Sequence, residues 1–214
     1  MNLTYLGQKY GTDKVDQWHT FLGDRYTDVY HRYLRHLRDV EFNMLEIGVR
    51  DGKSIKMWAE YFPKAKIVGI DIDPSCKRYE GGNVSVHIGS QEDEDFINRL
   101  ISQYKKFSVV LDDGSHINSM TMKSFQLLGK HTTDFYIVED LRNSYEDLTQ
   151  DVLSWPGMGY NQNLDADNSK TRPEFNKTIL DLIQTMDYRI GQWSGFYWHS
   201  QMLIMQKGNI CGNQ

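Results

Sequence analysis

The chain has 214 residues, with 24 Lys and Arg against 29 Asp and Glu, which gives a formal net charge of −5. A hydrophobic fraction of 39% with 25% charged residues excludes a disordered chain, and the mild acidity argues against the basic surface of a nucleic-acid binder. With only two cysteines and no apolar run of membrane-spanning length, we expect one cytoplasmic domain, without a disulfide framework or a membrane partner.

The first forty residues are expected to form a helical lead-in or lid before the main fold. Residues 27–38 predict a helix, because Tyr30, Tyr33, Leu34 and Leu37 fall on one face. Residues 10–14, YGTDK, carry the small and polar side chains of a loop that folds over a ligand.

Short apolar runs alternate with amphipathic ones through the middle of the chain. The runs at 44–49, 67–71, 84–88, 107–111 and 135–138 predict strands that are covered on both faces. The segments 54–61, 92–104 and 117–130 predict the helices between them. This alternation predicts an α/β fold over residues 41–214, with a doubly wound, mostly parallel, Rossmann-like sheet.

The C-terminal third predicts a loop, a helix and two strands. Residues 154–172 are polar and rich in glycine, so we expect a long loop that serves as a lid or contacts substrate. A helix is expected over 173–186, with Pro173 in its first turn. Residues 188–196 and 200–206 predict an antiparallel strand pair at the end of the fold.

The turns after the first three strands predict a nucleoside-binding edge. Gly48 permits a sharp turn and a close ligand approach, and Gly52 and Ser54 lie where the next helix begins. Asp71 ends the second strand, where an acid accepts hydrogen bonds from ribose hydroxyls. The candidate cofactor-binding residues are Glu46, Gly48, Arg50, Ser54, Asp71, Ile72, Ser90, Gln91 and Asp112.

The glycine pattern indicates which cofactor this edge binds. Dinucleotide sites use G-x-G-x-x-G around a pyrophosphate, whereas this chain has only E-x-G-x-x-x-G from Glu46 to Gly52. The pattern resembles the first motif of class I S-adenosylmethionine methyltransferases. The resemblance implies that Glu46 lies near the ammonium group of the cofactor and that Gln91 reads the adenine edge. The alternative is that these glycines are ordinary turns.

Acidic residues follow the fourth and fifth strands. Asp113, Glu139 and Asp140 are expected to converge, because both strands end at the same edge of the sheet. Three close carboxylates favour a hard divalent cation such as Mg²⁺, although such acids also cap helices or bind solvent. His116, three residues after Asp113, is placed to take the proton of a substrate hydroxyl as general base.

The motifs GTDK, LEIGVRDGKS, GIDID, LDDGSH and VEDLRNSY resemble the metal-dependent sugar O-methyltransferases of the macrolide and rhamnosyl group, whose motifs cephalosporin-hydroxylase-like proteins share. The resemblance covers about residues 10–146. It implies metal ligands at Asp113, Glu139 and Asp140, and a base at His116. The resemblance implies a large N-terminal domain in the macrolide enzymes, where we expect only a short lead-in for this chain.

If the acceptor is a sugar, residues of the lead-in are candidates to contact it, and each has a structural alternative. Lys14 and Arg25 either meet a phosphate of a nucleotide-linked sugar or are simply solvated. His19 is the histidine best placed to support His116. The aromatic residues of the segment either stack on a sugar or pack in the core: Trp18, Phe21, Tyr26 and Tyr30.

We expect a Mg²⁺-assisted O-methyltransferase that uses S-adenosylmethionine, acts on a sugar or glycoside and forms a homo-oligomer. The acceptor belongs to a glycosylated natural product or a surface polysaccharide precursor. A catechol-type O-methyltransferase, which uses a lysine base, is the second reading, and a non-catalytic nucleoside-binding partner subunit is the third. An RNA 2′-O-methyltransferase and a hydroxylase with a two-histidine iron site fit the residues less well.

Overall fold

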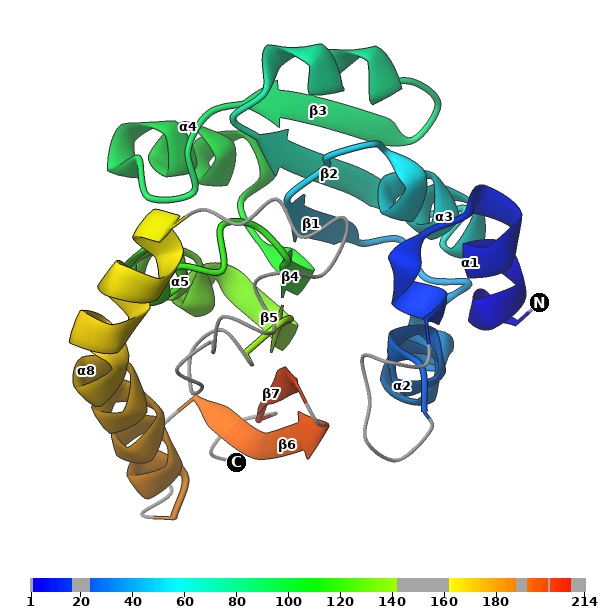
Figure 1. Ribbon diagram of the computed structural model, residues 1–214. Helices are drawn as coiled ribbons and strands as arrows, with labels where there is room; N and C mark the ends of the chain where they lie inside the picture. The colour runs from blue at the N-terminus through cyan, green and yellow to red at the C-terminus, as the bar shows by residue number, and fades with distance from the viewer. Residues whose placement is uncertain (1, 17–23, 142–161, 188–191, 200, 209–214) are drawn as a thin grey trace.

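The computed structural model describes residues 2–16, 24–141, 162–187, 192–199 and 201–208. Within these residues the chain forms one mixed sheet in the order β3-β2-β1-β4-β5-β7-β6 (Figure 1). The first five strands are parallel, and β7 is antiparallel to both β5 and β6. The strands are β1 Asn43–Ile47, β2 Lys66–Asp71, β3 Val84–Ile88, β4 Phe107–Asp112, β5 Thr132–Val138, β6 Trp193–His199 and β7 Met202–Lys207.

Helices cover both faces of the sheet (Figure 1). Neighbouring strand residues such as Met44 and Leu45 belong to different hydrophobic clusters, because successive side chains of a strand point to opposite faces. One cluster lies under α1 Leu3–Tyr10, α2 Tyr26–Leu34 and α3 Lys53–Tyr61. The other lies under α4 Glu94–Tyr104, α5 Asn118–Leu128 and α8 Gln162–Asp187. Both faces of the parallel strands are therefore buried, as the apolar runs predict.

Short 3₁₀ helices connect several of these helices and strands. Asp93 caps α4 by accepting a hydrogen bond from the backbone N–H of Phe96, so this helix begins two residues later than the predicted Glu92. The 3₁₀ helices are η1 Asp13–Val15, η3 Arg35–Leu37, η4 Pro74–Tyr79 and η5 Gly129–His131. None of the described helices has the length and apolarity that crossing a membrane requires.

The lead-in differs from the expected loop. Residues 3–10 form α1, whose Leu3 and Leu6 are fully buried in the first cluster. Gly11 ends the helix in a left-handed conformation with φ of +70°, and η1 follows at once. Within the YGTDK segment, only Gly11 and Thr12 therefore lie outside a helix.

The prediction for the C-terminal third is wrong at one point. Residues 162–172 belong to α8 and not to the expected loop, and Pro173 lies inside this helix instead of in its first turn. An interior proline removes one backbone hydrogen bond without ending the helix, and packing of Phe175 in the second cluster holds the segment on α5. Residues 154–161 lie outside the described residues. The antiparallel strand pair is confirmed, with β6 beginning at Trp193.

Candidate active site

A cavity of about 1150 Å³ opens at the carboxyl ends of the parallel strands. Its wall includes the lead-in residues Gly11 to Asp16 and the turns after β1, β2, β4 and β5. Most of the residues that the sequence singled out line it: Gly48, Arg50, Ser54, Asp71, Ile72, Gln91, Asp113, His116, Glu139 and Asp140. Glu46, Ser90 and Asp112 are not among its described lining residues.

The turn after β1 is held by the acid at the end of β2. Asp71 Oδ2 accepts hydrogen bonds from the backbone N–H groups of Val49 and Arg50, at 2.9 and 2.8 Å. Gly48 has a φ of +93°, and a Cβ there would collide with the backbone carbonyl of Asp113. Glycine at 48 is therefore needed both for the turn and for the close approach of the β4 loop.

Glu46 lies beneath the cavity and is fully buried. Trp58 Nε1 donates a hydrogen bond to Oε1 at 3.1 Å, while Oε2 is a buried oxygen without a hydrogen-bond partner in the described part of the chain. Burial raises the pKa of Glu46 to about 7, and the positive charge of Lys14 opposes this rise. A buried acid with an unused oxygen suits a cationic group of a ligand.

Gln91 lines the cavity and faces the buried Asp112. Gln91 Nε2 lies 3.2 Å from both carboxylate oxygens of Asp112, and Ser124 Oγ donates to Asp112 Oδ2 at 2.8 Å. Burial raises the pKa of Asp112 to about 6, which these donors oppose. Ser90 accepts a hydrogen bond from the backbone N–H of Glu92 at 3.4 Å.

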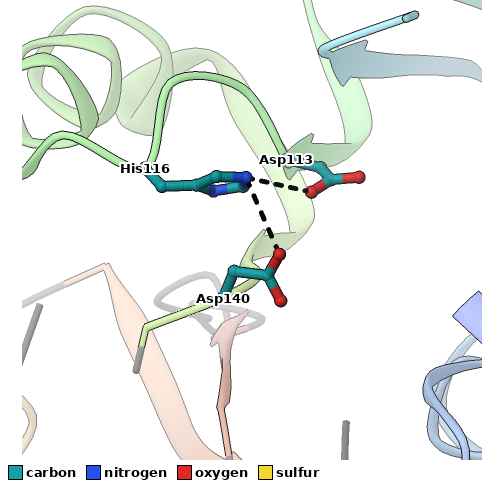
Figure 2. Close-up of side chains that lie close together, drawn as sticks. All are labelled: Asp113, His116 and Asp140. Carbon is teal, nitrogen blue, oxygen red and sulfur yellow. Dashed lines mark ion pairs between the residues drawn. The ribbon is translucent and has the colours of Figure 1, made fainter. Parts of the chain in front are cut away.

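Three side chains converge after β4 and β5. His116 Nε2 lies 3.9 Å from Asp113 Oδ1 and 3.7 Å from Asp140 Oδ2 (Figure 2). One candidate ligand atom from each of these residues falls within 4.8 Å of the others, which is close enough for a single metal ion. His116 and Asp140 have φ of +56° and +55°, a conformation that residues other than glycine seldom adopt. Such backbone is typical of functional sites.

Glu139 has a different environment from its two acidic neighbours. Its side chain is buried, Tyr30 donates a hydrogen bond to Oε1, and Lys14 Nζ lies 2.7 Å from Oε2. Lys14 also contacts Asp113 Oδ2, and Tyr26 donates to Asp140 Oδ1 at 2.9 Å. The structure thus brings all three predicted acids together, with Glu139 behind and Asp113 and Asp140 toward His116.

The structure agrees with neither of the two roles predicted for Lys14, a phosphate contact or a solvated side chain. Its side chain is only 2% exposed and forms ion pairs with two carboxylates, so it is neither solvated nor free to bind a phosphate. Burial alone lowers the pKa of Lys14, but the charges of Asp113 and Glu139 outweigh it and raise that pKa well above its usual value. Lys14 is therefore a permanent ammonium ion at the centre of the acidic cluster.

The two described tyrosines that the sequence singled out both pack in the first hydrophobic cluster. Tyr26 is 1% exposed, and its hydroxyl donates to Asp140 at the cavity wall. Tyr30 is fully buried and packs edge-on against Trp58. Arg25 is partly exposed and lies 3.9 Å from Asp28. Trp18, His19 and Phe21 lie outside the described residues.

The sheet order and the cavity at its carboxyl edge define a class I methyltransferase fold. The model matches the MycE methyltransferase from the mycinamycin biosynthetic pathway, solved in complex with Mg, SAH and mycinamycin VI, with a TM-score of 0.74 and 29% identity. The match covers 100% of this chain and 57% of that one. No family model matches the chain.

The family is identified by sequence similarity to curated relatives. L-olivosyl-oleandolide 3-O-methyltransferase of Streptomyces antibioticus is 33% identical over 191 residues, which are 85% of this chain and 45% of the relative. Mycinamicin VI 2''-O-methyltransferase of Micromonospora griseorubida is 33% identical over 192 residues, 86% of this chain and 44% of the relative. The chain belongs to this family of sugar O-methyltransferases, and it spans less than half the length of these two relatives.

Proposed function

We propose that the chain transfers a methyl group from S-adenosylmethionine to a hydroxyl of a sugar or glycoside with the help of Mg²⁺. The observation that carries this proposal is the convergence of Asp113, His116 and Asp140 in one cavity. The glycine turn after β1, at Gly48, lines the same cavity. A methyl donor and an acceptor hydroxyl bound in that cavity would meet beside a base and two carboxylates.

The residues around the turn fit the cofactor. The unpartnered oxygen of Glu46 is suited to its ammonium group, which would keep the buried carboxylate ionised. Asp71 Oδ1 accepts one hydrogen bond, from Asp73 N at 2.9 Å, and retains acceptor capacity for ribose hydroxyls. Ile72, 73% exposed on the cavity wall, offers an apolar surface to an adenine ring. Arg50, Ser54, Ser90 and Asp112 remain predicted cofactor residues.

The acids fit a hard divalent cation. Asp113, Glu139 and Asp140 would hold it through oxygen, the ligand type that Mg²⁺ prefers, and this leaves His116 as the base instead of a ligand. When bound, the cation supplies a positive charge that makes an adjacent hydroxyl more acidic. His116 Nε2 would accept the proton of that hydroxyl, while Tyr26 and Lys14 hold Asp140 and Asp113 in place.

The acceptor follows from the relatives. Mycinamicin VI 2''-O-methyltransferase and L-olivosyl-oleandolide 3-O-methyltransferase are named for glycosylated macrolides. These names support a glycosylated natural product as the acceptor that we propose, and a polysaccharide precursor stays a prediction from the sequence. The single domain over residues 1–214, the cytoplasmic location, the homo-oligomer and the lack of a nucleic-acid partner stay predictions from the sequence.

A catechol-type reaction is the second candidate. It uses a lysine as base, and Lys14 is the lysine that contacts the acidic cluster in the described part of the chain. Its ammonium group forms ion pairs with both Asp113 and Glu139, so the geometry favours His116 as the base and a sugar hydroxyl as the acceptor.

Acceptor screening distinguishes these reactions. The purified protein is incubated with S-adenosylmethionine, Mg²⁺ and a panel of glycosides, nucleotide sugars, catechols and amines, and methylated products are identified by mass spectrometry. We expect methylation of sugar hydroxyls. Methylation of catechols or amines alone would contradict the sugar assignment, and cofactor binding without any turnover would favour a non-catalytic partner subunit.

A further inference from the structure

Gln91 forms buried hydrogen bonds whose role the proposed reaction leaves unexplained. It follows β3 along the chain and is 5% exposed. Its Nε2 group lies 3.2 Å from both oxygens of Asp112 and 3.2 Å from Ser124 Oγ. Its Oε1 atom accepts a hydrogen bond from the backbone N–H of Ser115 at 2.9 Å. The amide is thus engaged at both ends by the protein itself.

The partner of Oε1 lies inside the loop that carries the reactive groups. Ser115 stands between Asp113 and His116, one residue before the left-handed backbone of His116. Gly114 packs so closely that a Cβ at this position would collide with Gln91 Oε1. The loop therefore rests directly on the Gln91 amide, and no larger residue fits at 114 without displacing it.

The other end of the amide is anchored in the core. Asp112 is buried, and it also accepts hydrogen bonds from Ser124 Oγ at 2.8 Å and from Gly114 N at 3.4 Å. Ser124 belongs to α5, which packs against α4 and α8. An amide held by a buried carboxylate and a buried hydroxyl has one orientation, because reversing it would bring its oxygen against the carboxylate.

We propose that Gln91 is a positioning residue for His116 and Asp113, in place of the adenine contact that the sequence predicts. This inference rests on the proposed function. The amide fixes the backbone of Ser115 and so sets the separation of His116 Nε2 from Asp113 and Asp140, on which proton transfer and metal affinity depend. Residues that orient metal ligands change affinity or activity by about 10- to 100-fold when they are mutated.

The test measures turnover and binding separately. In Gln91→Leu we expect kcat to fall by about 10- to 100-fold and Mg²⁺ affinity, measured by titration calorimetry, to fall by about tenfold. Affinity for S-adenosylhomocysteine should stay close to that of the wild type, because the amide faces the loop. Gln126→Leu, which makes the same exchange at an exposed position of α5, is the matched control and should change neither quantity.

A paired variant covers the case in which Gln91→Leu fails to fold. Gln91→Glu sets a second carboxylate against Asp112 and should lose turnover, and adding Asp112→Asn should restore part of it by exchanging the two groups. Lack of recovery would overturn the inference. So would unchanged kcat in Gln91→Leu, or a loss confined to S-adenosylhomocysteine affinity, which would make Gln91 a cofactor contact. If the wild type methylates nothing, Mg²⁺ affinity still tests the inference.

Discussion

Replacing Lys14 with methionine tests the ion-pair centre of the site. The Lys14 ammonium lies between Asp113 and Glu139 and is almost completely buried, while methionine keeps most of the apolar length of the side chain. The substitution therefore removes the charge with little change in packing. The buried carboxylate of Glu139 and the partly exposed carboxylate of Asp113 then remain beside Asp140 without this positive charge.

The expected loss of unfolding free energy follows from the burial of the ion pair. Breaking a buried ion pair by removing one partner costs about 3 to 5 kcal/mol, because the remaining charge is left uncompensated. A domain of this kind is stable by about 5 to 15 kcal/mol, so Lys14→Met should lose a large part of its free energy of unfolding. Mg²⁺ should stabilise the variant more than the wild type, since the site has lost a competing cation.

Urea unfolding in EDTA and in excess Mg²⁺, followed by circular dichroism, measures both effects. Lys64→Met is the control, because Lys64 is exposed and such surface changes stay within about 0.5 kcal/mol. A Lys14→Met variant that is as stable as the control in EDTA would refute the buried ion pair. Equal stabilisation of variant and wild type by Mg²⁺ would show that Lys14 and the cation do not share the same carboxylates.

Two further predictions concern Glu46 and His116. The pKa of Glu46 is raised from 4.5 to about 7 in the folded state, so its contribution to stability is present below pH 4.5 and is lost as pH rises through 7, by about 3 kcal/mol in total at 1.36 kcal/mol per unit. Glu46→Gln should flatten the unfolding free energy over this range, and an unchanged pH dependence would contradict the buried carboxylate. His116→Ala should lower kcat by about 10² to 10⁴ with intact S-adenosylhomocysteine binding, and wild-type turnover would place the base elsewhere.

Local patterns were sufficient for the parallel sheet and for the edge where the acids meet. The apolar runs around Leu45, Val68 and Val110 are covered on both faces, and this periodicity is visible in a single sequence. Asp113 lies one residue after the end of β4 and Asp140 two residues after the end of β5, and a parallel sheet gathers the carboxyl ends of its strands at one edge. No local pattern separates Asp140, which faces His116, from its buried neighbour Glu139.

Contacts between segments that are far apart in the sequence could not be predicted from local sequence patterns. Lys14 lies 125 residues before Glu139, and nothing in the segment YGTDK distinguishes a buried lysine from a solvated one. The sequence predicts Gln91 as a cofactor residue, but its bonds to Asp112 and Ser115 depend on the packing of α5. The first half of α8 was missed, because its polar composition and Pro173 resemble a loop and tertiary packing overrides both.

The central claim is metal-assisted methyl transfer to a sugar hydroxyl, and one measurement addresses it directly. The protein is incubated with S-adenosylmethionine labelled in its methyl group and with a glycoside acceptor, first in EDTA and then after Mg²⁺ is restored. We predict that label enters a sugar hydroxyl only when Mg²⁺ is present. Full transfer in excess EDTA would remove the cation from the reaction, and label on no hydroxyl in either condition would contradict the account.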